Sequence, residues 1–246
     1  MIKKLINIFY SNIITIFNNV IKKKYHEDSK KNIHLNDNRF LNSVKKLKFN
    51  KKNDISDHFE NIFYETFLIK PELILELGVR SGESTGIFIQ VCEMINSDLI
   101  SIDLEDCSNV IKSDKWKFIK YNSINFLQEY DTWSKSNGYN IPDVIFIDTS
   151  HLYEETLVEL ELSSKLLKKD GAIMLHDTNH NYINFYENGI FYKKINYNIQ
   201  DGVKKALNEF LGIKLNLNSN FILIKDNWLI KHYSTSFGFT ILKKLK

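Results

Sequence analysis

The sequence predicts an α/β fold in which a doubly wound, mostly parallel sheet of seven strands carries an antiparallel strand at its C-terminal edge. Short apolar runs alternate about five times with stretches of helical spacing, which is typical of parallel strands that helices cover on both faces. After residue 200 the pattern changes to one helical stretch and two strand-like stretches. Strands that follow one another without an intervening helix indicate antiparallel pairing at one edge.

The first 55 residues differ from the rest, and we place the folded domain at residues 56–246. Apolar residues recur at spacings of three and four between residues 5 and 21, which predicts an amphipathic helix. We expect it to pack on the domain or on a second copy of the chain; the alternative is contact with a membrane surface. Polar residues interrupt the apolar run, so neither a signal peptide nor a membrane span is expected. Residues 25–55 indicate a polar linker with at most one short helix.

Each expected element of the domain has a local signal. Pro71 separates the first helical stretch from a buried strand, because the residue before a proline disfavours a helix. Four apolar residues run unbroken from Val144 to Ile147, as a strand covered on both faces requires. The expected strands are 73–79, 98–106, the start of 115–127, 142–151, 170–179, 221–234 and 237–244, and the expected helices are 57–69, 82–96, the end of 115–127, 152–169 and 201–211.

Composition excludes several classes of function. The net charge of +3 and the pI of about 8.6 are too weakly basic for nucleic-acid binding without a clustered patch. The two cysteines, Cys92 and Cys107, lie far apart without the spacing of a zinc site or a disulfide framework. A reducing cytoplasm is therefore the expected location.

The end of the first strand carries glycines where the chain turns into a helix. Gly78 and Gly82 let the backbone approach a ligand closely, and the amides that open the helix can face a polar group. Their spacing is not that of a dinucleotide-binding or phosphate-binding loop. Asp103 ends the second strand about 25 residues after Glu76, where a carboxylate can accept hydrogen bonds from both ribose hydroxyls. A dinucleotide enzyme is disfavoured, whereas a ligand that contains ribose is expected.

Four segments together resemble class I S-adenosylmethionine-dependent methyltransferases: ILELGVRSGEST, SIDLED, DVIFIDTSHLYEE and GAIMLHDT. Within that class the chain is similar to a group that includes macrolide-sugar O-methyltransferases and cephalosporin-hydroxylase-like proteins, over roughly residues 60–245. The resemblance implies a Rossmann-like fold and S-adenosylmethionine as the cofactor. It implies the following cofactor contacts: Gly78 and Gly82 at the methionine moiety, Glu76 and Ser84 in the loop, Asp103 at the ribose, Asn122 and Ser123 near the adenine, and Asp148 beside the cofactor.

Two acids stand where the fourth and fifth strands end. Because the carboxyl ends of parallel strands meet at one edge, we expect Asp148 and Asp177 to converge beside the cofactor. Hard divalent cations prefer oxygen ligands, and a cluster of acids is costly without a cation. The resemblance implies Mg²⁺ or Mn²⁺ at this point, bound to hydroxyls of the substrate. Such a metal lowers the pKa of a coordinated hydroxyl and orients it toward the methyl group.

Two histidines lie beside these acids. His151, three residues after Asp148, stands where the resembled group carries a general base; the alternative is a histidine that caps a helix or packs in the core. His176 departs from the acidic pair that the sugar methyltransferases tend to have at the end of the fifth strand. It is a candidate metal ligand, a second base or a hydrogen-bond partner of Asp148. Asn179 is a further candidate ligand.

Aromatic residues are frequent between residues 179 and 198, directly after the fifth strand. We expect this segment to cover the acceptor, unless it packs against a partner subunit. The expected function is methyl transfer to a hydroxyl of a sugar or sugar-derived acceptor, in the biosynthesis of capsular or other surface polysaccharide. The alternatives are a phosphorylated or phosphoramidate-bearing acceptor and a catalytically inactive, cofactor-binding partner subunit. The expected partners are a small-molecule or glycan acceptor and a second copy of the chain, without nucleic acid.

Overall fold

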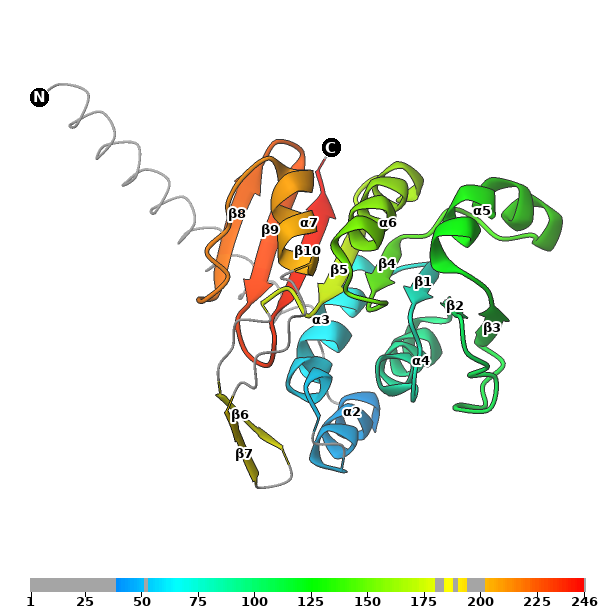
Figure 1. Cartoon of the computed structure of the whole chain (residues 1–246). Coiled ribbons are helices and arrows are strands. Elements are labelled where there is room, and N and C mark those ends of the chain that lie inside the picture. Colours follow the sequence, from blue (N-terminus) through cyan, green and yellow to red (C-terminus); the bar gives the residue numbers. More distant parts are fainter. Residues whose placement is uncertain (1–38, 51–52, 180–183, 188–189, 194–201, 246) are drawn as a thin grey trace, which may run out of the picture. The chain divides into compact units, whose positions relative to one another are not determined.

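The computed structural model describes residues 39–50, 53–179, 184–187, 190–193 and 202–245. In this part of the chain an eight-stranded sheet carries helices on both faces (Figure 1). The α/β class and the mostly parallel sheet that the sequence predicts are confirmed. The helix expected between residues 5 and 21 lies outside the described residues, so its role in dimerisation or membrane contact stays a prediction.

Five parallel strands and three antiparallel strands make up the sheet. They are β1 (Leu73–Leu77), β2 (Asp98–Asp103), β3 (Trp116–Lys120), β4 (Val144–Ile147), β5 (Ala172–His176), β8 (Phe221–Lys225), β9 (Trp228–Tyr233) and β10 (Phe239–Lys244). Their order is β3-β2-β1-β4-β5-β10-β9-β8, and β1 to β5 are the parallel ones. The strand order reverses between β1 and β4, which is where open α/β sheets bind ligands.

The sheet has eight strands, and the prediction of seven was wrong in one place. We predicted a single strand over residues 221–234, but this segment folds into the hairpin of β8 and β9. Lys225 pairs with Trp228, so Asp226 and Asn227 form a two-residue turn, in which Asp226 has a φ of 52°. Asp and Asn tolerate this left-handed conformation, and short turns of this kind join the strands of hairpins.

Helices cover both faces of the sheet (Figure 1). One face carries α2 (Arg39–Asn50), α3 (Phe59–Ile69) and α4 (Glu83–Ile95), and the other carries α5 (Ser123–Asn137), α6 (Tyr153–Leu166) and α7 (Gly202–Leu211). The short 3-10 helix η1 (Ile55–His58) precedes α3. α2 lies in the stretch for which we predicted a linker with at most one short helix. Its Leu41 and Val44 are buried, and it packs on α3 and α4.

The core lies on both sides of β1, in which every residue is buried. Leu73, Leu75 and Leu77 belong to the apolar cluster that α5, α6 and α7 cover. On the other face, Phe146 of β4 meets Phe88 of α4 with ring centroids 5.3 Å apart. Burial on both faces explains why the strands read as nearly continuous apolar runs.

A separate two-stranded antiparallel sheet consists of β6 (Asn184–Glu187) and β7 (Ile190–Lys193). These strands lie in the segment that we expected to cover the acceptor. The neighbouring residues 180–183, 188–189 and 194–201 are outside the described part of the chain, so the role of this segment stays a prediction.

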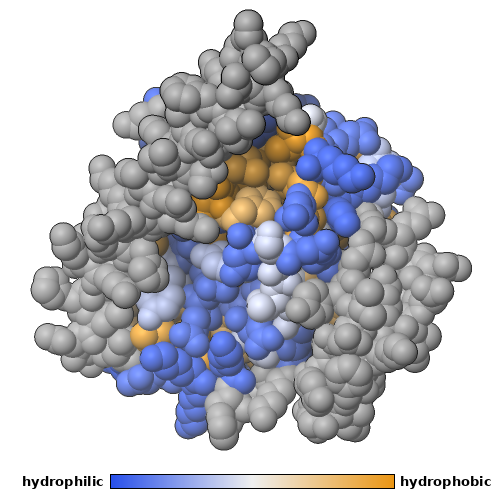
Figure 2. Space-filling model, turned by 90° about the vertical axis from the view of Figure 1, so that its left-hand side faces the viewer, coloured by the Kyte–Doolittle hydropathy of each residue, from blue (hydrophilic) through white to orange (hydrophobic). Residues whose placement is uncertain are grey.

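The antiparallel edge of the large sheet is β8, where Ile224 is 47% exposed. Figure 2 views the molecule from the side on which β8 lies in Figure 1, and it shows apolar surface bordered by hydrophilic residues.

None of the described helices has both the length and the apolar character that crossing a membrane requires.

One buried acid ties the central strand to the helix that follows it. Glu76 of β1 is fully buried and accepts hydrogen bonds from the hydroxyls of Ser84 at 2.6 Å, Thr85 at 2.8 Å and Ser101 at 2.6 Å. Burial raises the pKa of Glu76 to about 7, although the three hydroxyls favour the charged form. Ser84 and Thr85 belong to the first turn of α4, so Glu76 fixes the place where that helix begins.

Glu76→Gln should change how stability depends on pH. The folded-state pKa lies above the ordinary value of 4.5, so the contribution of Glu76 is fully present below about pH 4.5 and is lost as pH rises through about 7. Relative to Glu76→Gln, we expect the free energy of unfolding of the wild type to fall by on the order of 3 kcal/mol across this window, because the variant lacks the titrating carboxyl. Urea unfolding at a series of pH values measures both.

The control for this experiment is Glu161→Gln, which removes an exposed glutamate of α6. It should keep the wild-type pH profile. Parallel profiles of the wild type and Glu76→Gln would show that Glu76 does not titrate in this range.

Candidate functional site

The polar residues that the sequence singled out meet at the carboxyl edge of the parallel strands. Glu76 lies in β1, Asp103 ends β2, Asp148 follows β4, and His176 and Asp177 stand at the end of β5. β1 pairs with β2 and β4, and β4 pairs with β5, so these strand ends are neighbours. The parallel arrangement therefore brings together residues that are far apart in the sequence.

Two glycines shape the loop between β1 and α4. Gly78 has a φ of +92°, and a Cβ atom at this position would lie 2.1 Å from the backbone oxygen of Asp148. Gly82 has a φ of +79°, and a Cβ atom there would lie 2.8 Å from the side chain of Val110. Both positions require glycine, because other residues are strained in this conformation and would collide with their neighbours. The loop can thus lie directly against the exit of β4.

Asp103 fastens this loop to the end of β2. Its Oδ2 atom accepts hydrogen bonds from the backbone N–H groups of Val79 at 2.7 Å and Arg80 at 3.0 Å, and its Oδ1 atom accepts one from Glu105 at 2.9 Å. Burial disfavours the charge, but the hydrogen bonds from Arg80, Glu105 and Val79 hold the pKa of Asp103 below its usual range. The carboxylate is ionised at the edge where we predicted the ribose, and its contact with a ribose stays a prediction.

The predicted adenine residues begin α5. Asn122 caps this helix, because its side chain accepts a hydrogen bond from the backbone N–H of Asn125 at 3.0 Å. Ser123 donates its hydroxyl to Glu159 at 2.6 Å, and Thr149 donates its own to the other oxygen of Glu159 at 2.8 Å. Glu159 is 1% exposed, and burial raises its pKa. It joins the start of α5 to the loop after β4.

Sequence reasoning missed Glu159, since acids are common in this helix and usually face solvent. A signal was present, however. The buried residues of α6 are spaced as one helical stripe, and Glu159 stands inside that stripe: Thr156, Glu159, Leu160 and Ser163.

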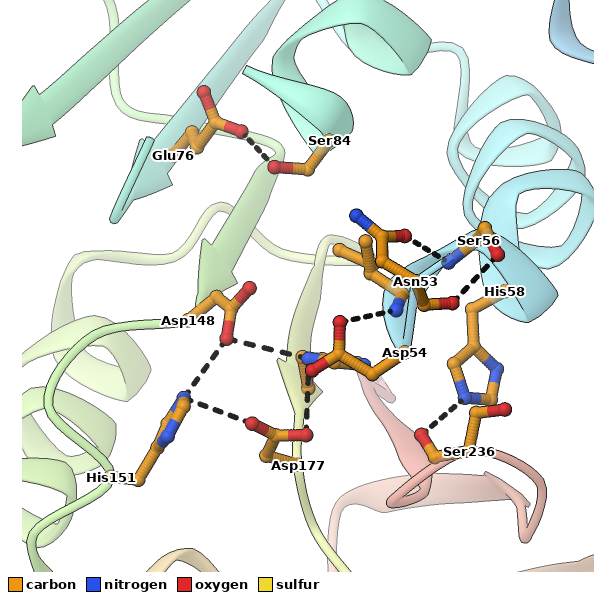
Figure 3. Close-up of polar contacts among 12 residues, drawn as sticks. Asn53, Asp54, Ser56, His58, Glu76, Ser84, Asp148, His151, Asp177 and Ser236 are labelled. Carbon is orange, nitrogen blue, oxygen red and sulfur yellow. Dashed lines mark hydrogen bonds and ion pairs between the residues drawn. The ribbon is translucent and has the colours of Figure 1, made fainter. Parts of the chain in front are cut away.

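Two acids and two histidines form one cluster after β4 and β5 (Figure 3). The Nε2 atom of His151 lies 3.0 Å from Oδ1 of Asp148 and 3.3 Å from Oδ2 of Asp177. The Nδ1 atom of His176 lies 3.4 Å from Oδ1 of Asp148 and 3.3 Å from Oδ1 of Asp177. Each imidazole therefore contacts both carboxylates. Asp148 and Asp177 lie close together, as we predicted.

The charges in this cluster stabilise one another. Burial disfavours ionisation of Asp148, but His176 and His151 hold the pKa of its carboxyl well below the usual range. Burial disfavours the imidazolium of His176, but Asp177 and Asp148 raise its pKa to about 9. Burial lowers the pKa of His151, but the hydrogen bond that it donates to Asp148 and the charge of Asp177 outweigh burial and raise it. Asp148 is thus ionised, and the imidazoles lie next to negative charge.

The backbone conformation at two positions of the cluster is unusual. His151 has a φ of 59° and Asp177 has a φ of 56°. Residues other than glycine rarely adopt this left-handed conformation, although His and Asp do so more often than most. Unusual backbone angles are concentrated at functional sites, where the surrounding structure holds them in place.

Three atoms of the cluster are close enough to share a cation. Oxygens of Asp148 and Asp177 and a nitrogen of His151 lie within 4.8 Å of one another, and among the described residues this is the group of His, Cys, Asp or Glu side chains with that property. Two carboxylates and one imidazole suit Mg²⁺ or Mn²⁺. The predicted ligands Asp148 and Asp177 are thus brought together. The third residue of the group is His151, whereas we had considered His176 as the third ligand.

Accessibility divides the cluster into two pairs. The side chains of His151 and Asp148 are 25% and 24% exposed, whereas those of His176 and Asp177 are 2% and 5% exposed. A ligand can therefore reach His151 and Asp148 directly. The amide of Asn179, the further candidate ligand, donates a hydrogen bond to the backbone oxygen of Leu217 at 2.8 Å.

Residues before α3 extend the cluster, and sequence reasoning missed them. His58 is buried, and its ring lies 5.7 Å from that of His176. Its Nε2 atom is 2.9 Å from the backbone oxygen of Thr235, in the turn between β9 and β10. Burial and His176 lower the pKa of His58 to about 4. Asp54 lies on the same side of the cluster in Figure 3, and its charge contributes to the raised pKa of His176.

Part of the chain is similar to a known family of protein domains. Residues 75–178 match a family model described as a methyltransferase domain. No curated protein sequence matches the chain. A Staphylococcus aureus structure named as a caffeoyl-CoA O-methyltransferase is 17% identical; the match covers 91% of this chain and 99% of that one, with a TM-score of 0.56.

Two further structures were solved with bound ligands. An O-methyltransferase from Bacillus cereus, in complex with SAH (S-adenosylhomocysteine), is 14% identical, with 95% of this chain and 99% of that chain covered and a TM-score of 0.52. MycE, a methyltransferase of the mycinamycin biosynthetic pathway in complex with Mg, SAH and mycinamycin VI, is 14% identical, with a TM-score of 0.51. That match covers 78% of this chain and half of MycE. These likenesses show a shared fold, and the matched family model places a methyltransferase domain at residues 75–178 of the chain.

Proposed function

We propose that this chain transfers the methyl group of S-adenosylmethionine to a hydroxyl oxygen of a sugar or sugar-derived acceptor, with the help of Mg²⁺ or Mn²⁺. The observation that carries the proposal is the cluster of Asp148, His151 and Asp177, which lies against the glycine loop at the carboxyl edge of the sheet. We further propose that the acceptor belongs to the biosynthesis of capsular or other surface polysaccharide, in the cytoplasm.

The structure of MycE supports both the cation and the class of acceptor. MycE was solved with Mg, SAH and mycinamycin VI, and the chain shares its fold. The residues that this chain would use for a cation lie where the strands of that fold end. The argument for the sugar rests on this likeness and on the sequence resemblance, since fold alone does not determine the acceptor.

The residues of the cluster would divide the work. Asp148 and Asp177 would hold the cation through their carboxylate oxygens, and His176, which contacts both, would keep them in position. A cation bound there supplies Lewis acidity that lowers the pKa of the acceptor hydroxyl. His151 would receive the hydroxyl proton, because its nitrogen lies beside the same oxygens and its side chain is accessible.

The glycine loop would place the methyl donor next to this hydroxyl. Gly78 lies against the backbone of Asp148, so a cofactor held along the loop is adjacent to the cluster. Methyl transfer is an in-line displacement, in which alignment of the two reacting atoms can contribute about 7 to 11 kcal/mol. The chain would supply that alignment by fixing both the loop and the cluster to the ends of adjacent strands.

A transfer assay tests the proposed reaction. S-adenosylmethionine with a labelled methyl group is incubated with the protein, Mg²⁺ and a panel of nucleotide sugars and polysaccharide fragments. We expect label in a sugar product, and we expect its loss when a chelator is added, because the hydroxyl would no longer be activated. Label in a phosphorylated acceptor without a methylated sugar would favour the alternative substrate class.

Asp103→Asn should weaken cofactor binding. The amide places an N–H₂ group against backbone N–H groups that now donate to the carboxylate, so the loop loses its attachment to β2. A hydrogen bond to a charged group contributes about 1.5 to 3 kcal/mol, so we expect the affinity for SAH to fall at least about tenfold in calorimetric titrations. Asp106→Asn, which changes an exposed acid three residues after Asp103, is the control. Equal affinity in both variants would contradict the role of Asp103.

Asp177→Asn should remove the cation. Asn keeps the left-handed backbone conformation that residue 177 requires, but it lacks the charge. Loss of an outer-shell partner of a metal site lowers the affinity for the metal roughly 10- to 100-fold. Because Asp177 would be a direct ligand, we expect a larger fall in the affinity for Mn²⁺, measured by electron paramagnetic resonance with SAH present.

Asp170→Asn is the matched control, because Asp170 is exposed and has a φ of 64°. It makes the same exchange in the same backbone conformation outside the cluster, so Mn²⁺ affinity should stay at the wild-type value. Wild-type affinity in Asp177→Asn as well would place the cation elsewhere.

A further inference from the structure

The segment from Asp148 to Tyr153 lies between two glycines that belong to different elements. Gly78, in the loop after β1, leaves room for the backbone oxygen of Asp148. Gly202, the first residue of α7, does the same for His151: a Cβ atom on Gly202 would lie 2.1 Å from the backbone oxygen of His151 and 2.8 Å from the backbone nitrogen of Tyr153. Backbone approaches of this kind are open to glycine alone.

Position 202 requires glycine because of this close backbone contact, and not because of an unusual backbone conformation. Its φ lies outside the left-handed range that is found at Gly78 and Gly82. In helices glycine is less favourable than alanine by about 1 kcal/mol, so its presence at the start of α7 indicates a packing requirement.

Two further residues of α7 hold the same segment. Lys205 follows Gly202 by three residues and Glu209 follows Lys205 by four, so the three residues share one face of the helix. The Nζ atom of Lys205 lies 3.5 Å from the ring centroid of Tyr153, and the hydroxyl of Tyr153 donates to Glu209 at 2.5 Å. α7 therefore contacts the chain at and directly after His151.

We infer that Gly202 is a positioning residue that seats the His151 imidazole between Asp148 and Asp177. The inference builds on the proposed function only in that His151 belongs to its site. His151 has the left-handed φ of 59°, and the place of its ring follows from the place of its backbone. Its Nε2 atom lies 3.0 and 3.3 Å from the two carboxylates, so a shift of about 1 Å breaks both contacts.

Gly202→Ala would force such a shift. A carbon atom normally stays about 3.3 Å or more from a carbonyl oxygen, so the new Cβ atom and the backbone oxygen of His151 would have to move apart by about 1 Å. α7 is attached to Tyr153 on the same face, so the displacement falls on the segment that carries His151.

The test compares Gly202→Ala with Gly86→Ala. Gly86 lies in α4, where a Cβ atom would meet its nearest neighbours at 3.7 and 3.8 Å, an ordinary contact. The first readout is the ring resonance of His151 in ¹⁵N-labelled protein, assigned from its loss in His151→Gln. The second is Mn²⁺ affinity with SAH present. We expect Gly202→Ala to move the resonance and to weaken Mn²⁺ binding about tenfold or more, and Gly86→Ala to change neither.

The two readouts separate this inference from the proposed function. Wild-type protein that fails to bind Mn²⁺ would contradict the proposed cation, and the ring resonance alone would then decide the role of Gly202. An unmoved resonance in Gly202→Ala overturns the inference. If that variant does not fold, the double variant Lys205→Ala/Glu209→Ala removes exposed contacts of the same helix face. It should move the resonance in the same direction, and an unmoved resonance there also overturns the inference.

Discussion

The β1–α4 loop lies against the exit of β4 because residue 78 has no side chain. Every other part of the site depends on this approach. The loop carries two of the backbone N–H groups that donate to Asp103, and the segment that it touches carries Asp148 and begins the turn to His151. Pairing of β1 with β4 brings the two segments to the same height, and glycine allows the last approach. A methyl donor and a hydroxyl can be held side by side only if these segments are in contact.

The buried acids of this edge differ in charge because their partners differ. Glu76 and Glu159 accept hydrogen bonds from hydroxyls, and burial raises the pKa of each. Asp148 and Asp177 contact imidazoles, which hold the pKa of Asp148 below its usual range. The acid whose ionised form is favoured therefore stands after β4, beside the two histidines, and not in the core beside β1.

Much of this site could be predicted from the sequence, since the ends of parallel strands must meet. That rule brought Asp148 and Asp177 together without knowledge of any contact. It says nothing about residues that reach the site from other elements, so Glu159 and His58 were missed. Glu159 is an acid inside α6, and His58 ends the short helix η1 before α3. The hairpin at Asp226 was missed because its turn has no glycine or proline, although Asp and Asn suit such a turn.

The strand order also bears on how the molecule folds. β8 and β9 are joined by two residues and pair locally, whereas pairing of β1 with β4 joins residues 74 and 144. The entropy lost in closing a loop grows with its length, so local hairpins form before distant pairs. We therefore expect the centre of the sheet to assemble after its antiparallel edge. The surface that receives the cofactor is then completed late, and a partly folded chain has no competent site to occupy.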